Sequence, residues 1–169
     1  MKHFKLIILL LISTTSLVGC GIYSFSGISI GPNIKTFQVR PFANEAAIVI
    51  PSLDRQLTTT LQDFILNQTN LDLTNKNGDI IYEGEITNYY IAPNTATANQ
   101  TAAENRLTIS VRMRYIDTKD EKNDLEKTFT FFFDYAGTAQ LTGAIEEEAY
   151  NVIIERITQD MVTETLARW

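Results

Sequence analysis

Three arginines of one predicted strand are the side chains in this sequence whose type and spacing best suit ligand binding. Arg106, Arg112 and Arg114 are separated by even numbers of residues, so a strand places all three on one face. A guanidinium group can make two parallel hydrogen bonds to a phosphate, and spaced arginines therefore suit a phosphorylated ligand. The alternative, which the residues alone favour, is a solvated face on which the arginines pair with carboxylates of neighbouring strands. The carboxylates available for such pairs are Glu83, Glu85 and Glu126.

The residue types that most often do covalent or metal chemistry are scarce in this chain. The sequence has one histidine, His3, and one cysteine, Cys20. The chain after residue 20 therefore has no Ser-His-Asp or Cys-His nucleophile, no His/Cys zinc site and no thiol pair for a disulfide. The densest acidic cluster, residues 146–148, falls in the first turns of a predicted helix, where negative charge favours the helix dipole. We expect a protein without enzymatic activity, metal or cofactor.

The first twenty residues have the order of an export signal. Lys2 and Lys5 precede an apolar run of about seven residues, and small residues follow up to Cys20. The run is far shorter than the roughly 20 residues of a membrane-spanning helix. The stretch Leu-Val-Gly-Cys that ends at Cys20 resembles the lipobox of bacterial lipoproteins, in which the cysteine is diacylated after cleavage. The resemblance implies a signal peptide at 1–19 and a stable anchor of two or more acyl chains on Cys20.

The residue that follows the cysteine bears on the membrane to which the chain is delivered. In the lipoprotein pattern, an aspartate at that position retains a protein in the inner membrane, whereas this chain has Gly21. No acidic run follows that would indicate display on the cell exterior. The pattern therefore implies the periplasmic side of the outer membrane.

Composition limits the remaining residues to one ordinary domain. About 150 residues follow the signal, enough for a single hydrophobic core. The whole chain is 44% hydrophobic and 20% charged, with a net charge of −6. Without Lys2 and Lys5, 12 basic residues face 20 acidic ones, a net charge of −8. Such a chain is a poor candidate for nucleic acid, because that binding depends on neutralising phosphates.

Hydrophobic periodicity predicts four strands and two helices. Alternation indicates strands at 34–42, 79–91, 105–116 and 125–135, and helical spacing indicates one helix that begins at Pro51-Ser52 and another that is capped by Thr142. Residues 20–33 are expected to form a tether, and residues 34–169 a single domain. The order β-α-β-β-β-α predicts an α+β two-layer sandwich, with two helices packed on one face of a four-stranded mixed sheet.

Aromatic residues suggest a second possible surface. Simple alternation predicts that one face of the second strand carries Ile80, Tyr82, Ile86 and Tyr90. Tyr89, Tyr90 and Phe132 are candidates for exposed aromatics at a protein interface. An equally good alternative is that these side chains cover the sheet edge or pack beneath the small-residue loop at 92–103.

Short strings along the chain resemble the lipopolysaccharide-assembly lipoprotein family, LptE. The strings are CGIYSFSG at 20–27, PSL at 51–53, GEI at 84–86 and ENRLTI at 104–109. They occur in the order of the predicted elements and cover nearly the whole chain after the signal. The resemblance implies a non-enzymatic outer-membrane lipoprotein that occupies the lumen of an LptD-type β-barrel, as its plug and assembly partner, and binds lipopolysaccharide. The basic lipid-contacting residues of the family fall on none of these strings.

This resemblance would give the arginine face a specific ligand, since the lipid A and inner-core sugars of lipopolysaccharide carry phosphates. A function of another class stays open: a free-standing periplasmic lipid-binding lipoprotein, or an auxiliary subunit of a lipid transporter. The two differ in whether the gently extracted protein is accompanied by an outer-membrane barrel.

Overall fold

The computed structural model describes residues 30–94 and 104–167. The predicted signal peptide, Cys20 and the tether up to residue 29 lie outside the described residues, as does most of the loop at 92–103. In the described ranges, neither helix combines the length and the apolar character needed to cross a bilayer.

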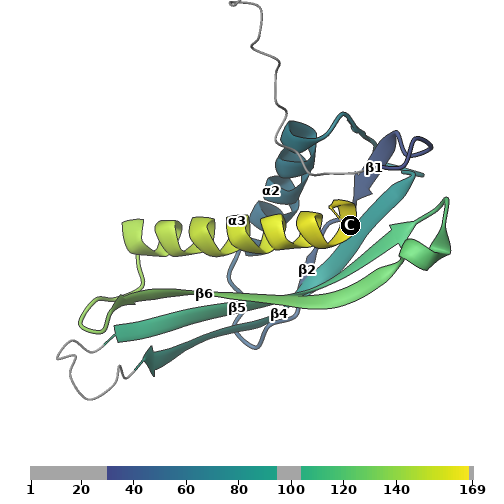
Figure 1. Cartoon of the computed structure of the whole chain (residues 1–169). Helices are drawn as coiled ribbons and strands as arrows, with labels where there is room; N and C mark the ends of the chain where they lie inside the picture. The colour runs from purple at the N-terminus through teal and green to yellow at the C-terminus, as the bar shows by residue number, and fades with distance from the viewer. Residues whose placement is uncertain (1–29, 95–103, 168–169) are drawn as a thin grey trace, which may run out of the picture.

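The described chain forms one mixed sheet and two long helices (Figure 1). In chain order the elements are β1 (Thr36–Val39), β2 (Ala43–Asn44), α2 (Leu53–Gln68), β3 (Asp72–Leu73), β4 (Ile80–Asn94), β5 (Glu104–Asp117), the short 3-10 helix η1 (Glu121–Asn123), β6 (Leu125–Ala136) and α3 (Ala144–Leu166). The strand order is β3-β1-β4-β5-β6, with β2 also beside β4. The three short strands pair in parallel, whereas β4, β5 and β6 form an antiparallel meander.

The α+β class, the two helices and the mixed sheet were predicted correctly, but the sheet has six strands and not four. The two extra strands, β2 and β3, have two residues each, which is too short for alternation to show. The predicted strand at 34–42 is shorter in the structure, where only Thr36–Val39 form β1 and pair with Ile80–Tyr82 of β4. After a gap at 40–42, β2 lies beyond the predicted range and pairs with the same strand at Glu85 and Ile86. Pro41 lies in the gap, where it has no backbone N–H to donate to the ladder.

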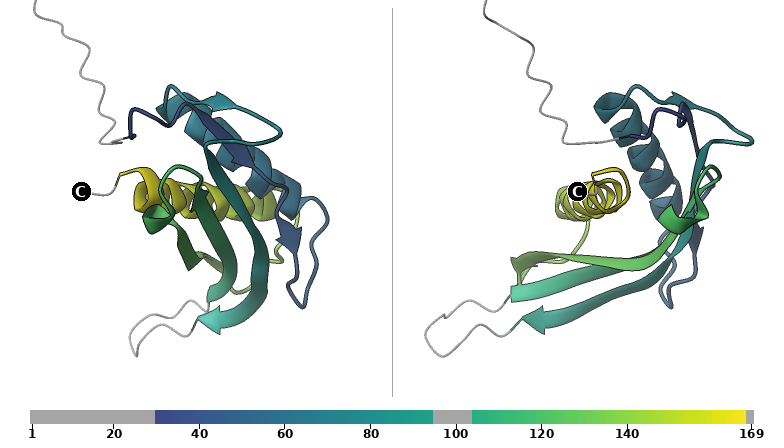
Figure 2. Two further views of the ribbon diagram at one scale, coloured as in Figure 1. Left: turned by 90° about the vertical axis from the view of Figure 1, so that its right-hand side faces the viewer. Right: turned by 45° about the vertical axis from the view of Figure 1, so that its right-hand side comes forward.

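Both helices pack on the same side of the sheet, which curves around them (Figure 2). Helix α3 covers β5 and β6, and α2 lies against the short strands and against α3. Each helix buries an apolar stripe at helical spacing, as predicted. The fully buried residues of these stripes include Leu57, Leu61 and Ile65 of α2, and Ile153, Ile157 and Met161 of α3.

Helix α3 begins differently from the prediction. Gly143 occupies the N-cap position with a φ of 60°, a backbone conformation that favours glycine, and no side chain caps the helix. Thr142 therefore does not cap α3, because it lies one residue before the N-cap.

The two central strands differ in how well alternation predicts them. In β5 every apolar residue of the predicted face is buried: Leu107, Ile109, Val111, Met113 and Tyr115. In β4 the pairing register shifts between Ile86 and Asn88, so Thr87 is an extra residue in the ladder. The bulge reverses the alternation beyond it. Tyr89 is consequently buried and Tyr90 points outward, the opposite of what simple alternation predicts.

Candidate binding face

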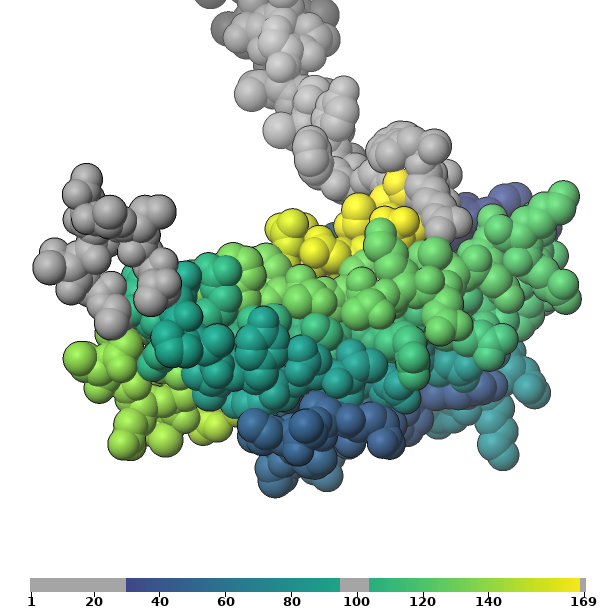
Figure 3. Space-filling model, turned by 90° about the horizontal axis from the view of Figure 1, so that it is seen from below, coloured from purple at the N-terminus to yellow at the C-terminus, as the bar shows by residue number. Residues whose placement is uncertain are grey.

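The side of β4, β5 and β6 that faces away from the helices has no helix over it, and Figure 3 looks onto this side. We call it the outer face. All three candidate arginines of β5 lie on it, because they alternate with the buried residues of that strand. Strands β4 and β6 contribute the neighbouring outward residues.

Arg112 and Arg114 lie together and pair with carboxylates of β4. The antiparallel register places Glu83 opposite Arg114 and Glu85 opposite Arg112. Arg112 forms an ion pair with Glu85, and the Nη1 atom of Arg114 lies 3.5 Å from Oε1 of Glu83. The two arginine side chains remain 52% and 58% exposed. Such exposed pairs contribute little to stability, because water screens them.

These residues border a shallow depression of about 520 Å³, which we call the charged depression. Its lining consists of Arg40, Pro41, Glu83, Gly84, Glu85, Arg112, Arg114 and Glu126. Arg40 was not singled out from the sequence, although it forms an ion pair with Glu83 and so shares that carboxylate with Arg114. Only the parallel register between β1 and β4 brings Arg40 here, and no local pattern encodes that register. Three half-exposed guanidinium groups in one hollow can bind a phosphate by exchanging a carboxylate for it.

Arg106 lies apart from the other two arginines. Six residues along a strand separate it from Arg112, a distance of about 20 Å. Its Nε and Nη2 atoms donate to the two carboxylate oxygens of Asp134, each at 2.7 Å. Its guanidinium carbon lies 3.6 Å from the centre of the Phe132 ring. The hydrogen bonds between the two side chains raise the pKa of Arg106 and lower the pKa of Asp134. A ligand role for the three arginines stays a prediction.

The three candidate aromatic residues also lie in two different environments. Tyr90 and Phe132 are exposed on the outer face, at 45% and 41%. Tyr89 instead lies in the core, where its hydroxyl is 3.1 Å from that of Tyr150, which in turn donates to Glu146. Burial raises the pKa of both tyrosines, so they stay neutral and hydrogen-bonded. Tyr89 is thus a structural residue, and only the other two remain candidates for an interface.

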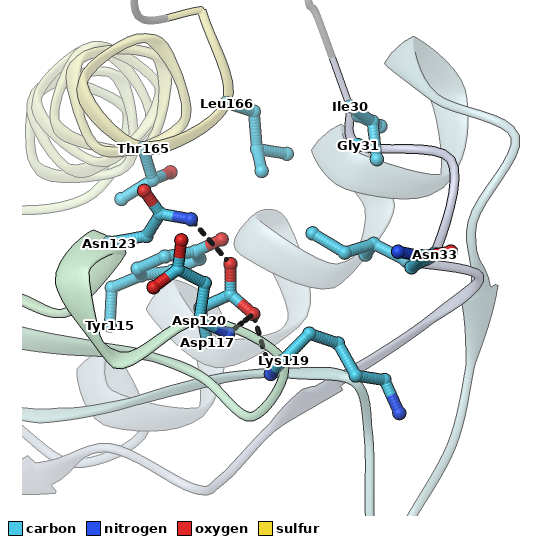
Figure 4. A pocket seen from close by; sticks show the side chains of 11 residues that line it. Ile30, Gly31, Asn33, Tyr115, Asp117, Lys119, Asp120, Asn123, Thr165 and Leu166 are labelled. Carbon is cyan, nitrogen blue, oxygen red and sulfur yellow. Dashed lines mark hydrogen bonds between the residues drawn. The ribbon is translucent and has the colours of Figure 1, made fainter.

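A second hollow, of about 450 Å³, lies where residues 30–34 pass the β5–β6 turn and the end of α3 (Figure 4). The buried carboxylate of Asp117 dominates its polar lining. One oxygen accepts from the backbone N–H groups of Lys119 and Asp120, at 2.8 and 3.1 Å, and the other accepts from Nδ2 of Asn123 at 2.8 Å. Both oxygens are therefore used by the turn itself. Across the described residues, no group of three potential metal-ligating side chains of the His, Cys, Asp or Glu type occurs.

Asp79 is a further residue that the sequence did not reveal. Its carboxylate is 2.7 Å from Nζ of Lys119 and accepts hydrogen bonds from the backbone N–H groups of Lys35 and Thr36, each at 3.0 Å. Lys119 and then these N–H groups hold the pKa of Asp79 well below its usual range. The residue joins the start of β1 to the β5–β6 turn, which is a structural role.

The protein is an α+β module whose uncovered sheet face carries paired charges at one end and aromatic residues at the other. The family model described as LptE, lipopolysaccharide assembly, matches residues 34–165. The chain belongs to this non-enzymatic assembly family, as the short strings predicted. No curated protein matches the chain.

Several solved structures are similar to the chain. A minor lipoprotein from Acinetobacter baumannii is 16% identical, with 78% of this chain and 91% of that chain covered and a TM-score of 0.48. An uncharacterized lipoprotein B from Nitrosomonas europaea is 15% identical, with 86% and 88% covered and a TM-score of 0.48.

Proposed function

We propose that this protein is a lipoprotein of the lipopolysaccharide export machinery, acting as the plug and assembly partner of an LptD-type outer-membrane β-barrel. The observation that carries the proposal is the lipopolysaccharide-assembly family model, whose match spans every strand and nearly all of both helices. The lipobox-like stretch that ends at Cys20 supports a lipid anchor on the periplasmic side of the outer membrane.

The charged depression is the proposed contact for lipopolysaccharide. Arg40, which directly follows β1, meets Arg112 and Arg114 of β5 there, although more than seventy residues of sequence separate them. The arginine side chains are about half exposed, so their ion pairs are screened by water and a lipid phosphate can compete with the carboxylates for the same N–H groups. The guanidinium fork suits a phosphate group, which lipid A and the inner core both carry.

Depletion of the protein tests the proposed role directly. We expect the amount of correctly assembled LptD-type barrel to fall, and the cells to become sensitive to large hydrophobic compounds, because lipopolysaccharide no longer reaches the outer leaflet. A plasmid copy of the wild-type gene should restore both. Normal barrel levels after depletion would remove the translocon role and favour the free-standing lipid-binding lipoprotein.

The anchor has its own test. Cys20→Ala should abolish incorporation of labelled palmitate, whereas Ser26→Ala, six residues later, should leave it unchanged. The fold should survive the loss of the acyl chains, because a large hydrophobic core forms among the described residues and Cys20 lies outside them. Palmitate in the Cys20→Ala protein would show that the anchor lies elsewhere.

A further inference from the structure

The far end of the outer face carries two large aromatic side chains in one cross-strand row. Tyr90 of β4 and Phe132 of β6 both lie directly opposite Thr108 of β5. Neighbouring strands are about 4.8 Å apart, so the two aromatic residues are about 10 Å apart on the same face. They are also among the most exposed large hydrophobic residues of the described chain. Thr108 between them is small, so the two side chains border one shared area.

The next row adds a charged residue whose charge is already compensated. Arg106 lies between Ala92 and Asp134, and its guanidinium stacks on Phe132, whose ring in turn stacks on Phe131 at 5.6 Å. Two of the three guanidinium nitrogens donate to Asp134, and Nη1 takes no part in these two bonds. We call Tyr90, Arg106, Phe132 and Asp134 the aromatic platform.

The chemistry of this platform suits a protein surface. Tyrosine and arginine are among the residue types that most often dominate binding energy at protein interfaces. Because Arg106 is paired within the chain, covering it leaves no uncompensated buried charge. Because the stack already holds its side chains in place, little side-chain entropy remains to be lost on docking.

The charges also argue against a lipid surface at this end. Membrane-binding patches attract anionic lipid with several unpaired lysines or arginines. Here a single arginine is neutralised by Asp134, and Glu104 lies on the neighbouring row position of the same strand face. With one arginine beside two carboxylates, this end is net negative and repels a phosphate, whereas the three arginines of the charged depression balance its three glutamates.

We infer that the aromatic platform is the docking surface for a protein partner. The partner's apolar and aromatic side chains pack on Tyr90 and Phe132, and one of its carbonyl oxygens accepts a hydrogen bond from Nη1 of Arg106. This inference rests on the proposed function, under which the partner is the LptD-type barrel protein. It assigns protein contact to one end of the outer face and leaves the lipid phosphate to the charged depression at the other.

Paired substitutions in the full-length, tagged protein test the inference. Tyr90→Thr with Phe132→Thr removes the aromatic rings but keeps side chains suited to a strand. The control, Leu66→Ala with Val152→Ala, removes similarly exposed apolar side chains from α2 and α3. The barrel that accompanies each protein after gentle extraction is measured by immunoblot against that barrel. We expect about tenfold less barrel with the platform variant, and an unchanged amount with the control.

A photo-crosslinking side chain placed at position 90, or at position 66, of the otherwise native protein keeps the test valid if the double variant does not fold. Crosslinks to the barrel are expected to be much stronger from position 90 than from position 66. Wild-type retention of the barrel by a folded platform variant would overturn the inference but not the proposed function. An equal loss of barrel in the control variant would also overturn it. So would a platform variant that retains the barrel but loses self-association or binding to phosphatidylglycerol vesicles. Absence of barrel with the wild-type protein would overturn both.

Discussion

The two ends of the outer face hold arginines of the same strand in different ways. At the charged depression, Arg112 and Arg114 each reach one carboxylate, and more than half of each side chain meets water. At the aromatic platform, Arg106 donates hydrogen bonds to both carboxylate oxygens of Asp134 and stacks on the ring of Phe132. Its side chain is only 36% exposed. The residue type is the same, so geometry alone separates an exchangeable ion pair from a fixed one.

Under the proposed function, this difference would let one sheet bind two partners. An exchangeable pair exposes donors that an anionic ligand can take over, whereas a fixed pair behaves as part of the packed structure. Strand β5 contributes to both ends, and about 20 Å of strand separates them. Between Arg106 and Arg112, this face of β5 carries Thr108 and Ser110, which have no charge and are buried.

The largest effect is expected from Gly84, in the floor of the charged depression. A Cβ at this position would lie 2.1 Å from the carbonyl oxygen of Arg112 and 2.9 Å from Cε1 of Phe42. Gly84→Val should therefore lower the free energy of unfolding by about 3–5 kcal/mol, because a backbone atom cannot move aside without disrupting the β4–β5 ladder. Thr128→Val, on the outer side of β6, should change it by less than about 0.5 kcal/mol. Equal urea midpoints for Gly84→Val and the wild type would contradict the close approach of the two strands.

The next largest effects concern the core that supports both ends. Leu57→Ala and Val111→Ala each remove buried methyl groups, and should destabilise the protein by roughly 2–4 and 1–3 kcal/mol respectively. Both should lower the urea midpoint in a single transition, with the two ends unfolding together. A chelator should leave this transition unchanged, and unfolding of the domain by chelator alone would overturn the expectation of a metal-free fold.

Much of this core could be predicted from the sequence, because its strongest elements are long and regular. Strand β5 alternates without interruption, so the five buried residues of its inner face were identified correctly. The two-residue strands β2 and β3 have no period to detect, and their pairing depends on contacts with distant residues. The bulge at Thr87 likewise leaves no local signal, and it exchanged the places of Tyr89 and Tyr90.

The sequence predicted which arginines lie on the outer face, but it predicted only some of the ion pairs that they form. Glu83 and Glu85 were correctly proposed as partners of β5 arginines, since charges of opposite sign recur at the same spacing on both strands. The partner of Arg106 is Asp134, which was not among the carboxylates proposed, because the β5–β6 register depends on how the turn between them closes. Arg40 and Asp79 were missed because their contacts cross more than forty residues of sequence.

Acid should weaken the protein through Asp79 and Asp134. Each has a pKa that is lower in the folded state than the value of about 3.9 of an unfolded aspartate. A lowered pKa stabilises the folded state above the unfolded value, and that contribution is lost as the pH falls below about 4 towards the folded-state value. The urea midpoint measured from pH 6 to pH 2 should therefore decrease below about pH 4.

Two substitutions test whether these two aspartates cause the loss of stability in acid. Asp79→Asn should make the decrease shallower by removing the link to the β5–β6 turn, and Asp134→Asn should do so by removing the fixed pair of the aromatic platform. A midpoint that rises between pH 4 and pH 2 would contradict the direction of both shifts.

The smallest change in stability is expected at the charged depression, although its effect on binding should be large. Arg112→Glu with Arg114→Glu should shift the free energy of unfolding by only about 0.5 kcal/mol, because both side chains are more than half exposed. The double variant should nonetheless bind purified lipopolysaccharide more weakly, since two phosphate donors become carboxylates. Wild-type binding should also decrease with added salt, which screens exposed charges.

A matched control separates the site from the total charge. Arg55→Glu with Arg156→Glu makes the same change in net charge on α2 and α3, away from the outer face, and should leave lipopolysaccharide binding close to that of the wild type. If the two double variants bind equally well, and circular dichroism shows both folded, Arg112 and Arg114 only pair with Glu85 and Glu83. The contrast between the two ends would then be one of structure alone, while the translocon role would stand, since it depends on barrel levels and not on these arginines. If only the outer-face variant loses binding, the exchangeable ion pairs of the charged depression are a ligand contact.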